Sequence, residues 1–136
     1  MILRDHKGTV IFAAIRMLFN CVDALEAEAA AMDEGLRLAL HWTNSPLVVE
    51  MDCAELLQMI QSRDVDRSRY VHHIREIRRI LTQERNISLA KISRHANEAS
   101  HTLACMGRSQ QRTACWLRNF PDEIASIVNS ECNHLA

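Results

Sequence analysis

Glycine and proline are scarce in this chain, with three glycines and two prolines among 136 residues. Both residues interrupt regular structure, so their scarcity predicts a protein dominated by helices. Long apolar runs are missing as well. The longest one, residues 10–15, is too short for the core of a signal peptide or for a membrane span. We therefore expect an intracellular, soluble protein, nuclear or cytoplasmic, without a signal peptide or a transmembrane segment.

Paired cysteines are absent too. The five cysteines make an odd count, with no CxxC pair and no regular spacing, and this pattern argues against a disulfide scaffold. Cys105, Cys115, Cys132 and His134 could in principle gather around zinc. Structural zinc sites, however, usually pair their ligands at short spacings that this sequence does not contain. Buried or free thiols are therefore the interpretation that we prefer.

The composition is that of an ordinary globular protein, with 48% apolar and 24% charged residues. A chain of this length fits a single domain over residues 1–136. Charge is segregated along it: residues 1–55 hold four Lys or Arg and nine Asp or Glu, whereas residues 63–94 hold nine and four. An acidic part that binds cations and a basic part that binds phosphates would suit a nucleic-acid enzyme. Solvated helix faces would give the same pattern.

Hydrophobic periodicity and helix-breaking residues predict an order of β-β-α-β-α-α-β-α-α. The expected strands are residues 1–4, 9–17, 47–51 and 87–92, and the expected helices are residues 23–43, 54–60, 71–86, 97–106 and 122–130. The first two strands form a hairpin over residues 1–17. Strands that alternate with helices after a leading hairpin imply an α/β fold, in which all four strands share one mixed sheet flanked by helices.

Short signals predict where helices begin and end. Asp23, with Glu26 three residues later, forms a capping box at the start of the first helix. Gly107 is expected to stop the fourth helix, and Pro121 to open the last one. We expect residues 107–136 to be a C-terminal extension that contains this last helix.

Two acids are the first candidates for chemistry. Glu28 falls at the edge of the apolar stripe of the first helix, and Asp52 follows the apolar strand of residues 47–51. Ligands of open α/β sheets bind at the carboxyl ends of strands. If helix and strand bring the two acids face to face in one cleft, they suggest a site for a divalent metal ion. The stripe consists of Leu25, Ala29, Met32, Leu36 and Ala39.

Each candidate also has a purely structural explanation. Asp52 with Glu55 three residues later could cap the following helix, and Glu28 could be a partly exposed acid. For phosphate binding, the candidates lie on the exposed side of the helix at residues 71–86, within the basic segment. They are Arg75, Arg78 and Arg79.

Short pieces of the sequence that match a known protein family occur in order along almost the whole chain. They are residues 2–8, 24–29, 34–39 and 49–53, followed by Arg94, Asn97, His101, Leu103, Ala104, Trp116 and Pro121. With these pieces the chain resembles the type 1 ribonuclease H domain of plant retrotransposon-type reverse-transcriptase-like proteins. The resemblance implies a ribonuclease H-like mixed sheet flanked by helices, and it adds Arg94 and Asn97 to the candidates for nucleic-acid binding.

The chemistry that the resemblance implies is hydrolysis of the RNA strand of an RNA–DNA hybrid, with two Mg²⁺ ions held by four carboxylates. Glu28 and Asp52 match the second and third of these acids, and His101 stands at the position of the fourth. The first acid belongs to an opening strand in the middle of the sheet. Met1 already lies within what resembles the second strand, so we expect the opening strand to be missing.

Two of four carboxylates predict weak binding of Mg²⁺ and impaired cleavage. His101 is a poor substitute for an oxygen ligand of Mg²⁺ and is better suited to softer metals or to proton transfer, and it could also be an ordinary surface histidine. We therefore expect a domain that binds nucleic acid, an RNA–DNA hybrid ribonuclease by descent. The alternatives are a non-catalytic nucleic-acid-binding module and a degenerate retroelement remnant.

Overall fold

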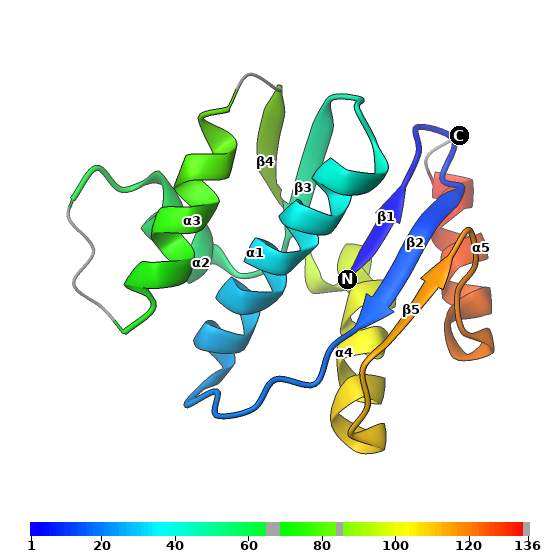
Figure 1. Cartoon of the computed structure of the whole chain (residues 1–136). Coiled ribbons are helices and arrows are strands. Elements are labelled where there is room, and N and C mark those ends of the chain that lie inside the picture. Colours follow the sequence, from blue (N-terminus) through cyan, green and yellow to red (C-terminus); the bar gives the residue numbers. More distant parts are fainter. Residues whose placement is uncertain (65–68, 84–85, 135–136) are drawn as a thin grey trace. The chain divides into compact units, whose positions relative to one another are not determined.

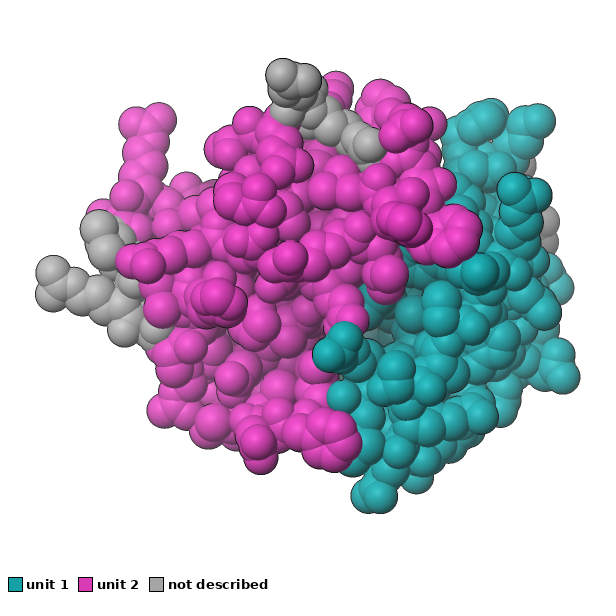
Figure 2. Space-filling model, viewed as in Figure 1, with its two compact units in different colours: residues 1–17, 94–136 teal, residues 18–93 magenta. Residues whose placement is uncertain are grey.

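The computed structural model describes residues 1–64, 69–83 and 86–134. The chain forms two compact units (Figure 2): unit 1 comprises residues 1–17 and 94–136, and unit 2 comprises residues 18–93. Each unit has its own sheet and its own apolar core. Antiparallel strands, parallel strands and five helices in the described residues make this a mixed α/β fold, consistent with the ribonuclease H-like fold. None of the described helices has the length and apolar character that crossing a membrane requires.

The sheet of unit 1 is antiparallel and confirms the predicted hairpin. Its strands β1 (Ile2–Arg4), β2 (Val10–Ile15) and β5 (Ala114–Leu117) lie in the order β1-β2-β5 (Figure 1). Asp5 closes the turn, because its Oδ1 accepts hydrogen bonds from the backbone N–H groups of Lys7 and Thr9, each at 2.9 Å. Gly8 supplies the positive φ, 83°, that the turn requires.

Helices α4 (Glu98–Gln110) and α5 (Ala125–His134) supply the other half of the core of unit 1. Each follows a short 3₁₀ turn, η1 (Arg94–Asn97) and η2 (Asp122–Ile124), and Pro121 precedes η2 as predicted. The buried residues that strands and helices share are Val10, Ala13, Ile15, Ala99, Leu103, Met106, Ile124 and Val128.

Two predictions for this unit were wrong. Helix α4 does not stop at Gly107 but continues to Gln110, and Gln111 ends it with a φ of 47°. Gly107 is buried on the helix face that meets β2: a Cβ added there would lie 3.5 Å from Cβ of Ile15, an ordinary van der Waals distance, so Gly107 is an interior residue of the helix and not its stop. Strand β5 was not predicted, because four residues without alternation give no periodic signal.

Unit 2 begins with the long helix α1 (Ala24–Trp42) and continues with β3 (Leu47–Met51), α2 (Ala54–Gln61), α3 (Val71–Leu81) and β4 (Ile87–Lys91) (Figure 1). Strands β3 and β4 are parallel, with Leu47 opposite Ile87 and Met51 opposite Lys91. The buried residues of the core cluster of unit 2 lie on its three helices. They are Ala29, Leu36, Leu56, Ile60, Ile74, Ile77 and Ile80.

The prediction of one continuous sheet was wrong. The predicted pairs, β1 with β2 and β3 with β4, are present, but the described strands form two sheets. Among the described strands, none is hydrogen-bonded to members of both pairs, and local sequence patterns do not specify which strands become neighbours.

Helix α3 is also shorter than predicted. It ends at Leu81 rather than near Asn86, because Thr82 caps it, with Oγ1 donating a hydrogen bond to the carbonyl of Arg79 at 2.9 Å. Residues 84–85 of the predicted helix, like residues 65–68 of the preceding polar loop, lie outside the described residues.

Candidate nucleic-acid and metal-binding site

Glu28 lies in the second turn of α1, and the start of this helix is fixed as predicted. Asp23 is the N-cap, and its Oδ1 accepts a hydrogen bond from the N–H of Glu26 at 2.9 Å. In a standard capping box the side chain of Glu26 would accept a hydrogen bond from the N–H of the N-cap, Asp23. Here Oε2 of Glu26 accepts instead from the N–H of Val22, one residue earlier, at 2.7 Å. The side chain of Asp23 also accepts a hydrogen bond from the hydroxyl of Tyr70. This anchored first turn leaves Glu28 exposed to solvent, outside the core of unit 2.

Asp52 directly follows β3 and is partly buried. The residue before α2 is Cys53, which acts as the N-cap without a side-chain hydrogen bond. Asp52 thus lies one residue before the N-cap, and the capping-box explanation of Asp52 stays a prediction. Asp52 also stands at the carboxyl end of a parallel strand, the position at which ligands of α/β sheets bind.

The described residues contain no group of three or more His, Cys, Asp or Glu side chains that could hold a metal ion. Glu28 and Asp52 both belong to unit 2, whereas His101 is exposed on α4 of unit 1. The close approach of the two acids stays a prediction. Of the proposed zinc ligands, Cys105 and Cys115 are free thiols, and the side chains of Cys132 and His134 lie outside the described part of the structure.

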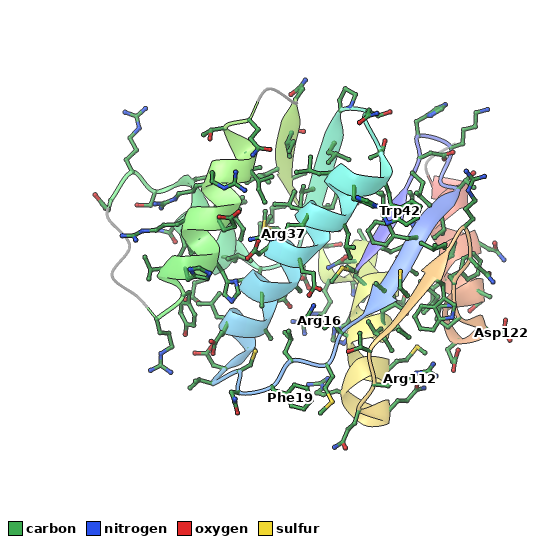
Figure 3. The ribbon with its side chains drawn as sticks, in the orientation of Figure 1. Arg16, Phe19, Arg37, Trp42, Arg112 and Asp122 are labelled. Atoms are coloured by element: carbon green, nitrogen blue, oxygen red, sulfur yellow. The ribbon has the colours of Figure 1, made fainter. Side chains whose placement is uncertain are left out.

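The acid that is actually buried on α1 is Asp33, which the sequence analysis did not select. It is 6% exposed, and its carboxylate accepts hydrogen bonds from Nε of Arg37 at 2.9 Å and pairs with Nδ1 of His73 on α3 at 3.1 Å. Arg37, labelled in Figure 3, also reaches Glu76 of α3 with Nη2 at 3.2 Å. A signal was present in the sequence, because Asp33 lies four residues after Ala29 on the buried face.

The three arginines predicted to bind phosphate have different surroundings. Arg75 is exposed. Arg79 is paired with Glu76, whose Oε1 lies 2.6 Å from Nη2, and this hydrogen bond lowers the pKa of Glu76. Arg78 is not on the exposed side: it donates to the carbonyls of Met59, Ile60 and Ser62 at 2.6, 3.1 and 2.8 Å.

Arg78 therefore satisfies carbonyl groups at the carboxyl end of α2, where a cation also complements the helix dipole. Sequence periodicity could not reveal this role, because it depends on how α2 and α3 pack. Of the three arginines, Arg75 is exposed and forms no ion pair with another described residue, whereas Arg78 has a structural role.

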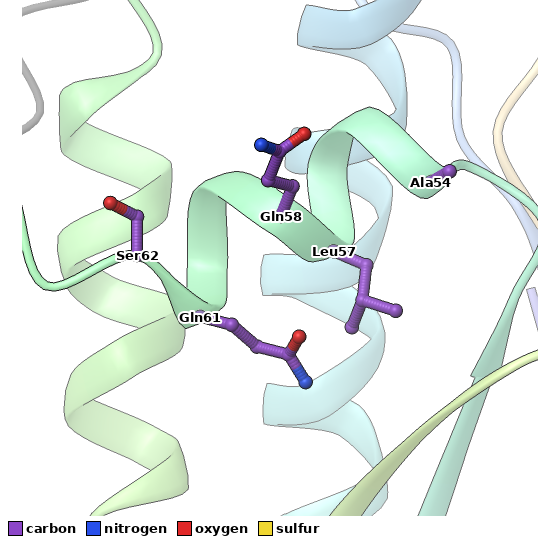
Figure 4. A pocket seen from close by; sticks show the side chains of 5 residues that line it. All are labelled: Ala54, Leu57, Gln58, Gln61 and Ser62. Atoms are coloured by element: carbon purple, nitrogen blue, oxygen red, sulfur yellow. The ribbon is translucent and has the colours of Figure 1, made fainter.

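The remaining predicted contacts, Arg94 and Asn97, lie in unit 1 at the entrance to α4. Arg94 begins η1 and is exposed, and Asn97 is the partly buried N-cap of α4, without a side-chain capping bond. The described surface also has a shallow depression along α2, which contains none of the predicted site residues (Figure 4). It is lined by Ala54, Leu57, Gln58, Gln61 and Ser62.

Comparison with known proteins gives one match. A family model described as reverse transcriptase-like matches residues 1–107, which is more than half of the chain. The match contains the whole of unit 2 and every predicted site residue, and it ends before β5 and α5. The chain matches no curated protein and no solved structure at a significant level.

Proposed function

The chain belongs to the reverse transcriptase-like family, a ribonuclease H-like family, over residues 1–107. From this membership we propose that it binds RNA–DNA hybrids as a ribonuclease H-type domain, and that its 136 residues by themselves hydrolyse the RNA strand poorly. The observation that carries the proposal is the position of Glu28 and Asp52 within one unit. They lie on a helix and directly after a strand. The sequence resemblance assigns these two positions to family acids.

The donor set limits what the site can hold. Two carboxylates fit a single Mg²⁺ ion whose remaining ligands are water and phosphate oxygens, and they do not fit a pair of ions. When bound, such an ion would polarise a phosphate and lower the pKa of a water molecule. Glu28 and Asp52 would orient the ion. His101, an exposed imidazole, is the family-position residue that could accept or donate a proton.

Binding of the nucleic acid is assigned to exposed cations. Arg75 is the first candidate in unit 2, because its guanidinium is exposed and forms no ion pair with another described residue. Arg79 contributes less, since Glu76 neutralises part of its charge. Arg94 and Asn97 are the candidates in unit 1. Contacts of this kind bind phosphates without reading the sequence of the bases.

Cleavage and binding of a labelled RNA–DNA hybrid test the proposal together. The chain should bind the hybrid with an affinity that falls as salt is raised, and should cleave it very slowly in Mg²⁺. An N-terminal extension that supplies the family's opening strand with its Asp should increase cleavage. Asp52→Asn and Glu28→Gln should then abolish it.

Arg75→Gln tests the role of this cation in binding. Its control is Asn119→Gln, a substitution at an uncharged, exposed position in unit 1. Arg75→Gln should weaken binding to hybrid and duplex alike and reduce the salt dependence. Binding with no cleavage in any variant would leave a non-catalytic nucleic-acid-binding module. No binding even at low salt, or robust cleavage that survives both acid substitutions, would overturn the proposal.

A further inference from the structure

Two polar side chains converge on the sulfur of Cys105, on the surface of α4. The Sγ atom lies 3.8 Å from Nε2 of His101 and 3.3 Å from Nη2 of Arg108, which donates a hydrogen bond to it. The three residues are spaced i−4, i and i+3, so they share one face of the helix. Cys105 is partly buried, while His101 and Arg108 are exposed, so reagents in solution can reach this cluster.

The other described cysteines have different surroundings. Burial, together with the nearby charges of Glu26 and Asp23, raises the pKa of the Cys21 thiol. Cys53 packs against the core of unit 2. Cys115 is more exposed than Cys105, but its thiol forms no hydrogen bond with another described residue.

Such surroundings decide how a thiol reacts. A thiolate, not a thiol, attacks a disulfide, so a neighbouring base that takes the proton and a cation that stabilises the anion both promote the reaction. An imidazole within reach of a nucleophile can act as this base. A guanidinium can in addition pair with a carboxylate of an incoming molecule. The cluster thus supplies a nucleophile, a proton acceptor and an anion-binding group.

We propose that Cys105 is a modification site, at which low-molecular-weight disulfides that carry carboxylates form a mixed disulfide. His101 accepts the proton of the thiol, and the Cys105 thiolate attacks one sulfur of the disulfide. The new S–S bond forms as the old one breaks, and the departing thiolate takes up a proton. The disulfide itself is the oxidant, so no further reactant is needed. Both proposals assign proton transfer to His101, but this one does not rest on the nuclease assignment, because its test measures modification of Cys105 and not cleavage.

The test uses the full chain with two probes of opposite charge, oxidised glutathione and cystamine, and measures the rate of modification at each cysteine by peptide mapping. Because Cys115 is more exposed, simple accessibility predicts that it reacts first. The proposal predicts that Cys105 reacts roughly tenfold faster than Cys115 with oxidised glutathione. With cystamine the advantage should be smaller, because Arg108 repels a cation.

Substitutions then distinguish the role of His101 from that of Arg108. Arg108→Gln should slow the reaction of Cys105 with oxidised glutathione several-fold. It should change the rate with cystamine much less, because the loss of a cation that stabilises the thiolate is offset by the loss of a cation that repels this probe. His101→Gln should slow the reaction of Cys105 with both probes, because it removes the proton acceptor. Arg112→Gln, an exposed arginine on the segment before β5, is the matched control and should change neither. Circular dichroism should show unchanged helix content in all three variants. Equal rates at Cys105 and Cys115, or a Cys105 rate that neither His101→Gln nor Arg108→Gln lowers, would overturn the proposal.

Discussion

Unit 1 and unit 2 are stabilised by contacts of different range. In unit 1, Arg4 of β1 forms an ion pair with Glu131 of α5, 127 residues later, and Glu131 also accepts a hydrogen bond from the N–H of Ala99 at 3.3 Å. Unit 2 is one continuous stretch in which ion pairs join α1 to α3. The family match covers all of unit 2 but stops inside α4 of unit 1. The comparison teaches that residues beyond 107 complete a core that the matched region only begins.

The largest expected effect comes from the core of unit 1. Ile124 is fully buried and lies beyond the family match, so Ile124→Ala should lower the free energy of unfolding by roughly 2–5 kcal/mol. Ile74→Ala, at an equally buried position, is the counterpart in unit 2. Hydrogen exchange should show early loss of protection in β2 and α4 for the first variant and in α1 and α3 for the second. A loss below about 1 kcal/mol for Ile124→Ala would contradict the role given to the C-terminal segment.

Removal of Arg78 should give the next largest effect, and it falls in unit 2. Arg78→Ala leaves three carbonyl groups at the end of α2 without their donor. Hydrogen bonds that involve a charged group contribute about 1.5–3 kcal/mol each at most, and water replaces part of this, so we expect a loss of about 2 kcal/mol in urea unfolding. Arg75→Ala is the control and should change stability by less than about 0.5 kcal/mol. Equal effects of the two substitutions would disprove the structural role of Arg78.

A smaller effect is expected from the long-range ion pair of unit 1. Glu131→Gln keeps an oxygen that can accept from Ala99 but loses the charge that pairs with Arg4. Both side chains of this ion pair are largely buried, so the cost should be about 1–2 kcal/mol in the free energy of unfolding. Glu123→Gln, an exposed acid before α5, should have almost no effect. The idea that Glu131 joins β1 to α4 and α5 fails if both variants unfold at the same urea concentration.

The smallest effect concerns the loss of stability at low pH, and added salt should change this loss differently in the two units. Hydrogen bonding from the N–H of Thr9 lowers the pKa of Asp5, and hydrogen bonding from Arg79 lowers that of Glu76. A lowered pKa in the folded state stabilises the fold above the usual values of 3.8 and 4.5, and this contribution is lost as the pH falls through the folded value.

Asp5→Asn and Glu76→Gln should each therefore flatten the fall of the melting temperature below pH 4.5, the ordinary value for Glu76. In roughly 1 M salt the difference in melting temperature between the parent and Glu76→Gln should shrink, because salt screens the ion pair between Glu76 and Arg79. The melting-temperature difference for Asp5→Asn should shrink less, because the largest cause of its lowered pKa is the uncharged N–H group of Thr9, and the charges of His6 and Lys7 contribute less. If both differences respond equally to salt, the contrast between the two units does not hold.

Part of the candidate site could be predicted from the sequence. Glu28 and Asp52 were assigned to a helix and to the end of a strand, and they lie there, because each assignment needs only a local pattern. Their separation in space is set by how the helices and strands of unit 2 pack together, which no local pattern contains. The same limit explains why Arg78 was mistaken for an exposed cation. Asp33, in contrast, did leave a local signal, its position on the buried face of α1 four residues after Ala29.

The sequence by itself determined the hairpin, the cap at Asp23 and the parallel strands β3 and β4 as separate elements, because a turn residue, a capping side chain and an apolar run act over a few residues. Only the tertiary structure decided which strands share a sheet, why α4 continues past Gly107, and that β5 exists at all. These features depend on contacts between residues far apart in the chain, such as Gly107 with Ile15 and β5 with β2. Contacts of this kind exist only once the elements have packed together.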